Sequence, residues 1–314
     1  MNRQPSQHPA GAGRVAGALT GALLVVASTA SVQGSAALAS GLFDRANPLA
    51  VTGLRQAFGA LALILLLRPR LRGRSAAQWR SIGVLAVAMA TMNSLYYLAV
   101  DVLPLGVAAT LFYLGPFVLA ARNTPRGPEL LLPVVALGGV YLATRAGGPG
   151  TVGTTGVLLG LAAGAALAAY TLASQKLGRA QGLDSLTLAV AGSALLLLPA
   201  SIPAVPGLRG SDVLVLVAVG AVGVTVTYGA DFLALQISSV RLVSVLFALD
   251  PVMGVFIGAA FLAESLQTSA LLGVAMVVVS GACVTAITAR SPADTAAGRG
   301  TAERETGSGT DSEP

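Results

Sequence analysis

Charged and aromatic side chains are both scarce in this chain. Only 10% of its 314 residues are charged and 5% are aromatic, whereas 54% are hydrophobic. A soluble domain carries about 25% charged residues, so the composition excludes an ordinary soluble protein and predicts a membrane protein. Because rings are few and glycines number 38, we expect small residues to bring the helices into close contact.

Histidine and cysteine each occur once. The single histidine, His8, lies in a polar segment, which excludes a metal site or a proton relay built on histidine. The single cysteine, Cys283, excludes an intramolecular disulfide. Aspartate and glutamate therefore remain as the candidate proton carriers, and we expect no metal and no cofactor.

Long apolar runs account for most of the sequence. A helix of roughly 20 apolar residues crosses a bilayer core of about 30 Å, and ten runs qualify: residues 15–39, 48–67, 81–100, 103–121, 129–145, 154–173, 185–202, 212–235, 242–262 and 269–289. The fold class predicted is therefore an all-α integral membrane protein with ten transmembrane helices. Residues 1–13 and 291–314 are polar and are predicted to be disordered tails.

The basic residues are distributed unevenly between the two sides. If both termini are cytoplasmic, only Arg45, Arg145 and Arg209 lie outside and Arg55 lies within a span, which leaves 15 of the 19 lysines and arginines inside. This split follows the positive-inside rule for a cell membrane protein. The net charge of +6 thus reports topology, and we expect contacts with lipid but no nucleic-acid partner.

The two halves of the chain resemble each other at an offset of 135 residues. That offset places Pro116 on Pro251 and Glu129 on Glu264, within the segments YYLAVDVLPLGVAATLFYLGP (96–116) and DFLALQISSVRLVSVLFALDP (231–251). Five spans in each half make the second repeat enter the membrane from the opposite side. We therefore predict two inverted five-helix repeats, residues 14–145 and 146–290, an architecture common in secondary transporters.

Several segments together resemble the EamA-type drug/metabolite transporters, and among them most closely the threonine and homoserine exporters. These segments are ASVQGSAALASGLF (30–43), LRQAFGALAL (54–63), MNSLYYLAV (92–100), LPLGVAATLFYLGP (103–116) and LDPVMGVFIGAAFLAESL (249–266). The resemblance implies two EamA repeats in the inner membrane of a bacterium and export of a small metabolite driven by protons. Phe112 and Leu167 depart from the glutamate and tryptophan that the resemblance leads us to expect.

Asp250 and Pro251 interrupt an otherwise apolar span near its middle. A carboxylate there is costly, so Asp250 is a candidate site for a proton or a substrate ammonium; the alternative is a protonated side chain that holds a kink. Pro251 lacks an N–H and should leave the carbonyl of Phe247 unpaired, and Pro116 repeats this kink in the first half.

Arg55 lies about a third of the way into the second span. Its guanidinium is a candidate for binding a substrate carboxylate. The alternatives are a gating or structural role, and an arginine that extends to the membrane surface or pairs with a buried aspartate.

Three further charged residues fall near span ends. Asp231 and Arg241 flank a short turn and form either an inner-gate ion pair or ordinary boundary charges, and the resemblance suggests helix-end or gate bonding for Glu264. Uncharged polar residues within spans are candidates either for substrate binding or for bonds between helices: Gln33, Asn93, Tyr96, Tyr113, Tyr170 and Tyr228.

The function predicted is export of a small amino-acid-like metabolite of the threonine and homoserine type by alternating access. A drug, a nucleoside or another metabolite is the alternative cargo. An intramembrane enzyme would need a reacting constellation such as His-Glu-x-x-His, and a channel would need rings of charge or a carbonyl filter; the sequence has none of these. The oligomeric state stays open.

Overall fold

The computed structural model describes residues 10–121, 131–145, 153–177, 182–237 and 246–288, and all regular structure in these residues is helical. The first half forms α1 (Ala10–Ser40), α2 (Pro48–Leu67), α3 (Ala76–Val102), α4 (Leu105–Ala121) and α5 (Leu131–Arg145). The second half begins with α6 (Thr154–Leu177) and α7 (Gly182–Ser201), which a 3-10 segment (Ile202–Gly207) extends. The third rod of the second half joins α8 (Gly210–Val217), a π-helical segment η4 (Ala218–Val224) and α9 (Thr225–Ile237). The second half ends with η5 (Phe247–Leu249), α11 (Asp250–Phe261) and α12 (Thr268–Thr288).

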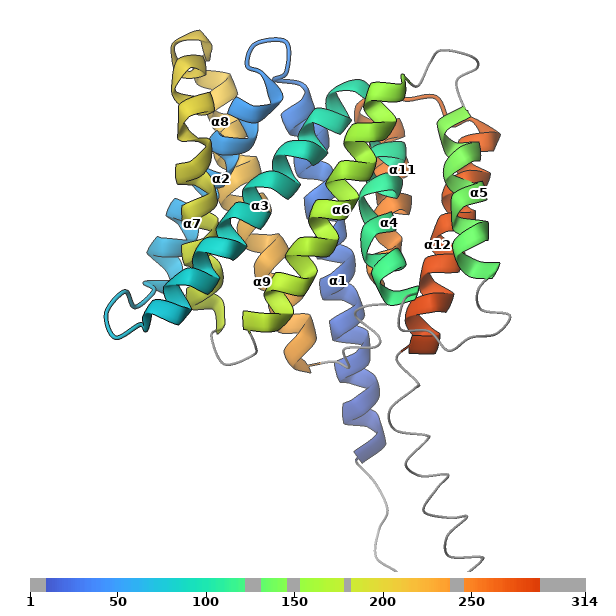
Figure 1. Cartoon of the computed structure of the whole chain (residues 1–314), viewed down its shortest axis with the longest axis horizontal. Helices are drawn as coiled ribbons and strands as arrows, with labels where there is room; N and C mark the ends of the chain where they lie inside the picture. Colours follow the sequence, from blue (N-terminus) through green and yellow to red (C-terminus); the bar gives the residue numbers. More distant parts are fainter. Residues whose placement is uncertain (1–9, 122–130, 146–152, 178–181, 238–245, 289–314) are drawn as a thin grey trace, which may run out of the picture.

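These elements make ten helical rods in the described part of the chain, which confirms the predicted fold class. Six of them are long and apolar enough to cross a membrane, and four shorter apolar helices complete the set. The protein is therefore a multi-pass membrane protein. The rods run side by side, and the start of α1 and the end of α12 lie at the same end of the bundle, the lower end in Figure 1.

Local sequence signals explain where several helices begin. The Asn47 side chain accepts a hydrogen bond from the Ala50 N–H (2.9 Å), and Pro48 takes the first helical position of α2. Ser75 and Gln78 form a reciprocal capping box at the start of α3. Polar caps at connections are expected because the first N–H groups of a helix have no partner within it.

The packing is symmetric when the two halves are exchanged. The second, fourth and fifth rods each pack against their own counterpart, as α2 on α7, α4 on α11 and α5 on α12. Contacts of the first rod of each half are matched as well, since α1 packs on α9 and α11 just as α6 packs on α3 and α4. Because α1 starts at the lower end and α6 at the upper end (Figure 1), the two repeats are inverted.

Glycines lie where the helices of the two halves approach most closely. A Cβ on Gly164 of α6 would lie 2.5 Å from the Leu111 carbonyl oxygen and 3.3 Å from the Gly115 nitrogen of α4. Gly139 and Gly273 meet in the same way between α5 and α12. Small residues thus let backbones touch, as expected in a membrane where lipid competes with side-chain packing.

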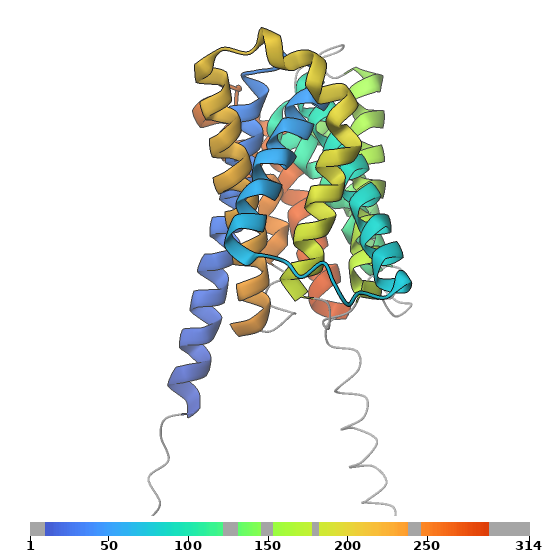
Figure 2. The same ribbon diagram turned by 90° about the vertical axis from the view of Figure 1, so that its left-hand side faces the viewer.

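Ion pairs tie the two halves together at both ends of the bundle. Arg45, just before α2, pairs with Asp212 in the first turn of α8 at 2.5 Å. Arg74, just before α3, pairs with Asp184 in the first turn of α7 at 3.8 Å. Exchange of the halves relates α2 to α7 and α3 to α8, so the two pairs occupy equivalent positions at opposite ends with their charges swapped. In Figure 2 the α2–α3 connection lies at the lower end and the α7–α8 connection at the upper end.

Candidate functional site

Arg55 is buried inside the bundle. Its Nη2 donates to Asn93 Oδ1 (2.7 Å), and Asn93 Nδ2 in turn donates to the Met89 carbonyl oxygen (2.8 Å). Its Cζ lies 4.9 Å from the centroid of the Tyr97 ring, a cation–π contact. The side chain is only 8% exposed and the ion pairs in the described residues involve other arginines. In the described residues Arg55 therefore neither extends to the membrane surface nor forms an ion pair with an aspartate.

Asp250 lies at the start of α11, fully buried. Gln33 of α1 and Tyr113 of α4 flank its carboxyl group. Tyr96 of α3 donates from its hydroxyl to Gln33 Oε1 (2.8 Å), which links Asp250 to α3 through one side chain. Four rods thus meet around one ionisable group, three from the first repeat and one from the second.

The kink expected at Pro251 has a different hydrogen-bond pattern. The Phe247 carbonyl is not left unpaired, because η5 tightens the chain into a 3-10 turn in which the Asp250 N–H donates to it. Pro251 then occupies an early position of α11, where a missing N–H costs nothing. Pro116, its counterpart in the first half, lies inside α4.

Asp231 of α9 is half-buried, and one of its carboxyl oxygens is enclosed by the bundle. Its Oδ1 is buried without a hydrogen-bond partner, and Ser28 of α1 lies beside its carboxyl group. Tyr170 and Tyr228 are within range of its charge. Arg241, its expected partner in an inner-gate pair, lies outside the described residues.

Glu264 lies at the upper end, in the connection between α11 and α12. Its Oε1 accepts a hydrogen bond from the Leu105 N–H (2.8 Å) at the start of α4. Burial raises the pKa of this carboxyl group, and the bond from Leu105 opposes the shift. A pocket beside it, of about 30 Å³, is too small for a metabolite.

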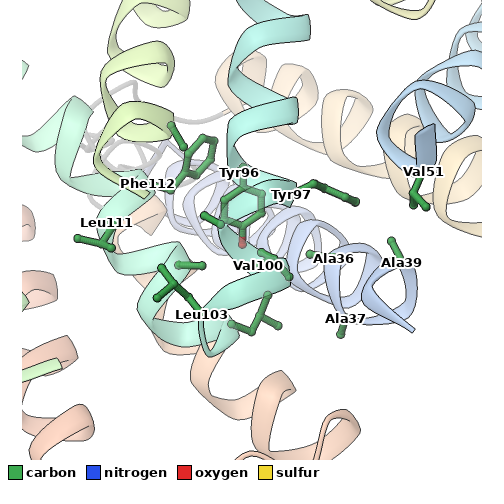
Figure 3. Close-up of a cluster of buried hydrophobic side chains, with 14 of the residues drawn as sticks. Ala36, Ala37, Ala39, Val51, Tyr96, Tyr97, Val100, Leu103, Leu111 and Phe112 are labelled. Carbon is green, nitrogen blue, oxygen red and sulfur yellow. The ribbon is translucent and has the colours of Figure 1, made fainter. Parts of the chain in front are cut away.

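Aromatic rings connect the surroundings of Arg55 with those of Asp250. Tyr96 and Tyr97 follow each other on α3, with ring centroids 6.1 Å apart, and Phe112 lies 4.5 Å from Tyr96 and 5.3 Å from Tyr113. Figure 3 shows Tyr96, Tyr97 and Phe112 next to one another where α3 and α4 meet α1. Leu167, the second departure from the expected pattern, is half-buried against the same core.

Several polar atoms in this region have no partner. Unpaired donors occur at Arg55 Nε and Gln33 Nε2, and unpaired acceptors at Asp231 Oδ1 and Asp250 Oδ1. A buried polar atom without a partner is costly, so such atoms mark positions where a ligand can supply one. We call the residues that surround them the polar cluster: Gln33, Arg55, Asn93, Tyr96, Tyr97, Tyr113, Tyr170, Tyr228, Asp231 and Asp250.

Two features of the site were not predicted from the sequence. The π-helical segment Ala218–Val224 reads AVGAVGV, which gives no indication of its geometry. It places the Gly223 carbonyl in reach of α1, where the Ser31 hydroxyl donates to it (3.1 Å). Tyr97, whose hydroxyl is buried without a partner, could have been found as a polar neighbour of Tyr96 within an apolar span.

Comparison with known proteins identifies the second half directly. Residues 154–286 match the model of the EamA-like transporter family. These residues belong to the EamA-like transporter family. The match confirms the prediction of a transporter rather than an enzyme.

Similarity to known transporters extends over most of the chain. The chain is 29% identical over 259 residues to the threonine/homoserine exporter RhtA of Escherichia coli K12, covering 82% of this chain and 88% of that protein. It is 27% identical to RhtA of Salmonella typhimurium LT2, covering 86% and 92%. A solved structure titled "Crystal structure of protein" superposes with a TM-score of 0.61 at 19% identity, covering 89% of this chain and 99% of that one, and supports the fold.

Proposed function

We propose that this protein exports a small amino-acid-like metabolite across the inner membrane of a bacterium, with both termini in the cytoplasm, and that protons drive it. The observation that carries the proposal is the polar cluster, in which a buried arginine and buried carboxyl groups retain unpaired atoms of opposite kinds. An amino acid has a carboxylate to accept from Arg55 and an ammonium to donate to Asp250. The relatives that carry the name threonine/homoserine exporter support the same cargo class.

The position of the polar cluster also supports alternating access. Asp250 belongs to the second repeat and the side chains that flank it belong to the first. Inverted-repeat carriers bind substrate between the repeats and expose it to either side by moving one repeat against the other. The equivalent ion pairs at opposite ends are contacts that such a movement would break and remake in turn.

A second cargo class is favoured by one observation. Phe112 presents an aromatic ring beside Tyr96 and Tyr113 within the polar cluster. Aromatic faces stack on planar ligands, so a nucleoside or an aromatic drug is the alternative substrate.

Transport by purified protein tests both proposals. Proteoliposomes would be assayed for counterflow of labelled threonine and homoserine, with and without a pH gradient, for the parent protein, Asp250→Asn and the exposed control Asp101→Asn. We expect Asp250→Asn to lose gradient-driven accumulation and to exchange the amino acids more weakly, because the carboxylate that holds the proton or the ammonium is gone, whereas Asp101→Asn behaves as the parent. If the parent moves neither amino acid but moves a labelled nucleoside, the amino-acid cargo is refuted and the aromatic alternative is supported.

A further inference from the structure

The guanidinium of Arg55 is held in the bundle by an uncharged side chain. Its Nη2 donates to Asn93 Oδ1 at 2.7 Å, and each of the two residues is only 8% exposed. A buried arginine is ordinarily paired with a carboxylate, which cancels its charge. Within the described part of the chain the ion pairs involve Arg45 and Arg74 instead. The positive charge of Arg55 is therefore not cancelled by an ion pair among these residues.

The orientation of the Asn93 amide is fixed by its own helix. Its Nδ2 donates to the Met89 carbonyl oxygen at 2.8 Å, one turn earlier on α3. Because the nitrogen is bound there, the oxygen is the atom that faces Arg55. A rotated amide would set its NH₂ group against the guanidinium and lose both hydrogen bonds. Asn93 thus presents a fixed, neutral acceptor to Arg55.

A second residue of α3 contacts the face of the guanidinium. Tyr97 follows Asn93 by one helical turn and so lies on the same side of α3. Its ring centroid is 4.9 Å from Arg55 Cζ, a contact that attracts the cation without neutralising it. Arg55 Nε is buried without a hydrogen-bond partner among the described residues. The arrangement keeps the cation in place and leaves one of its donors for a ligand.

Asparagine and aspartate have nearly the same shape, but only asparagine leaves the charge of Arg55 free. A carboxylate at position 93 would form a charge-assisted ion pair with the guanidinium and compete with an incoming anion. We propose that Asn93 is a positioning residue, which holds Arg55 without cancelling its charge and so makes the polar cluster selective for substrates that carry a carboxylate. This role rests on the proposed function and deepens it, because a neutral nucleoside would leave the buried cation uncompensated.

A double-mutant cycle tests the charge of the site without any substrate. The midpoint of unfolding by sodium dodecyl sulfate would be measured for the parent protein, Asn93→Asp, Arg55→Gln and the variant with both substitutions. With Arg55 present the new carboxylate gains an ion pair, whereas in the Arg55→Gln background it is buried without a partner. We therefore expect Asn93→Asp to lower the midpoint much less in the parent than in the Arg55→Gln background. Equal shifts in both backgrounds would overturn the inference.

Gln56→Glu is the matched control for these measurements. It makes the same change from amide to carboxylate in a buried residue of α2, but the Gln56 amide donates to Ser193 Oγ (3.2 Å) rather than bonding to an arginine. Gln56→Glu should therefore lower the midpoint more than Asn93→Asp does, a comparison that does not depend on folding of the Arg55→Gln protein. An Asn93→Asp protein that is as unstable as Gln56→Glu, or that does not fold, would overturn the inference.

Competition in counterflow tests the selectivity itself. Uptake of labelled threonine would be inhibited by unlabelled threonine and by threoninamide, in which a neutral amide replaces the carboxylate. Threonine should inhibit the parent about 10- to 100-fold more strongly, the effect of one hydrogen bond to a charged group. Asn93→Asp should lose this preference or take up no threonine. Asn93→Leu misplaces Arg55 but leaves its charge free, so it should bind threonine more weakly and still prefer it to threoninamide.

The two kinds of measurement separate the role of Asn93 from the proposed function. If the parent moves neither threonine nor homoserine, the amino-acid cargo is refuted, and the unfolding midpoints still decide whether Asn93 faces an uncompensated cation. If the parent moves threonine and Asn93→Asp keeps the full preference for threonine over threoninamide, the transport function stands and the role of Asn93 is refuted.

Discussion

Replacement of Gly164 by alanine tests the close contact between α4 and α6. Its Cβ would lie 2.5 Å from the Leu111 carbonyl oxygen and 3.1 Å from that of Phe112, and both of these are backbone atoms. Ordinary contact distances begin near 3.5 Å, so the two helices would have to separate by about 1 Å. No side chain can turn away to relieve the contact.

The stability that Gly164→Ala loses by overpacking should exceed the stability that alanine gains over glycine in a helix. Alanine stabilises a helix interior by roughly 0.5–1 kcal/mol relative to glycine, whereas overpacking of a well-packed site costs about 1–3 kcal/mol. Because backbone must move, we expect the upper end of that range and a net loss of about 2 kcal/mol in the free energy of unfolding. Gly83 of α3 is the matched control, since its Cβ would meet nothing within 4 Å.

Unfolding by sodium dodecyl sulfate in mixed micelles, followed by circular dichroism, measures the difference. Gly83→Ala should raise the free energy of unfolding by roughly 0.5–1 kcal/mol, which would place the two variants about 3 kcal/mol apart. A Gly164→Ala variant as stable as the Gly83→Ala variant would refute the argument that these backbones touch.

Three more predictions concern the charged residues. Arg55→Gln should raise the half-saturating concentration of an amino-acid substrate about 10- to 100-fold, because a hydrogen bond to a charged group is lost. Arg55→Lys should give a value between those of the parent and Arg55→Gln. Counterflow at several substrate concentrations measures these values, and equal affinity in all three proteins would exclude a contact between Arg55 and the substrate carboxylate. The folded protein raises the pKa of Glu264 and so binds the proton of this carboxyl group more tightly than the unfolded chain does. The free energy of unfolding should therefore fall as the pH rises from the ordinary pKa of 4.5 to the raised pKa of the folded protein. Detergent unfolding at several pH values should show a smaller pH dependence in Glu264→Gln, and an unchanged pH dependence would contradict the prediction. Arg45→Gln should destabilise the protein more than Arg74→Gln, because Asp212 is buried whereas the Asp184 side chain is 40% exposed; equal losses in the same unfolding assay would argue against a role for burial.

The span pattern was predictable because hydrophobic length and helix breaks are local properties. Expected limits such as 48–67 and 154–173 agree closely with α2 (Pro48–Leu67) and α6 (Thr154–Leu177). The inverted repeat was also predictable, since the offset that relates Pro116 to Pro251 survives in the sequence. Those signals need no knowledge of which helices meet.

Contacts between residues far apart in the chain could not be predicted from the sequence. Glu264 bonds to Leu105 across 159 positions, and nothing local in either segment indicates the other. For Asp231 the sequence left two interpretations open, an inner-gate ion pair with Arg241 or an ordinary boundary charge. Its burial depends on neighbours from α1, α6 and α4, which only the packed bundle provides.

The π-helical segment between α8 and α9 has a consequence for the direction of every side chain after it. A π-helical turn holds one more residue than an α-helical turn, so the chain leaves it rotated by roughly 100°, one residue's share of a 3.6-residue turn. A helical wheel drawn through Ala218–Val224 therefore assigns Asp231 to the wrong face. One additional residue in that turn therefore changes the direction that the Asp231 side chain takes around the axis of the rod.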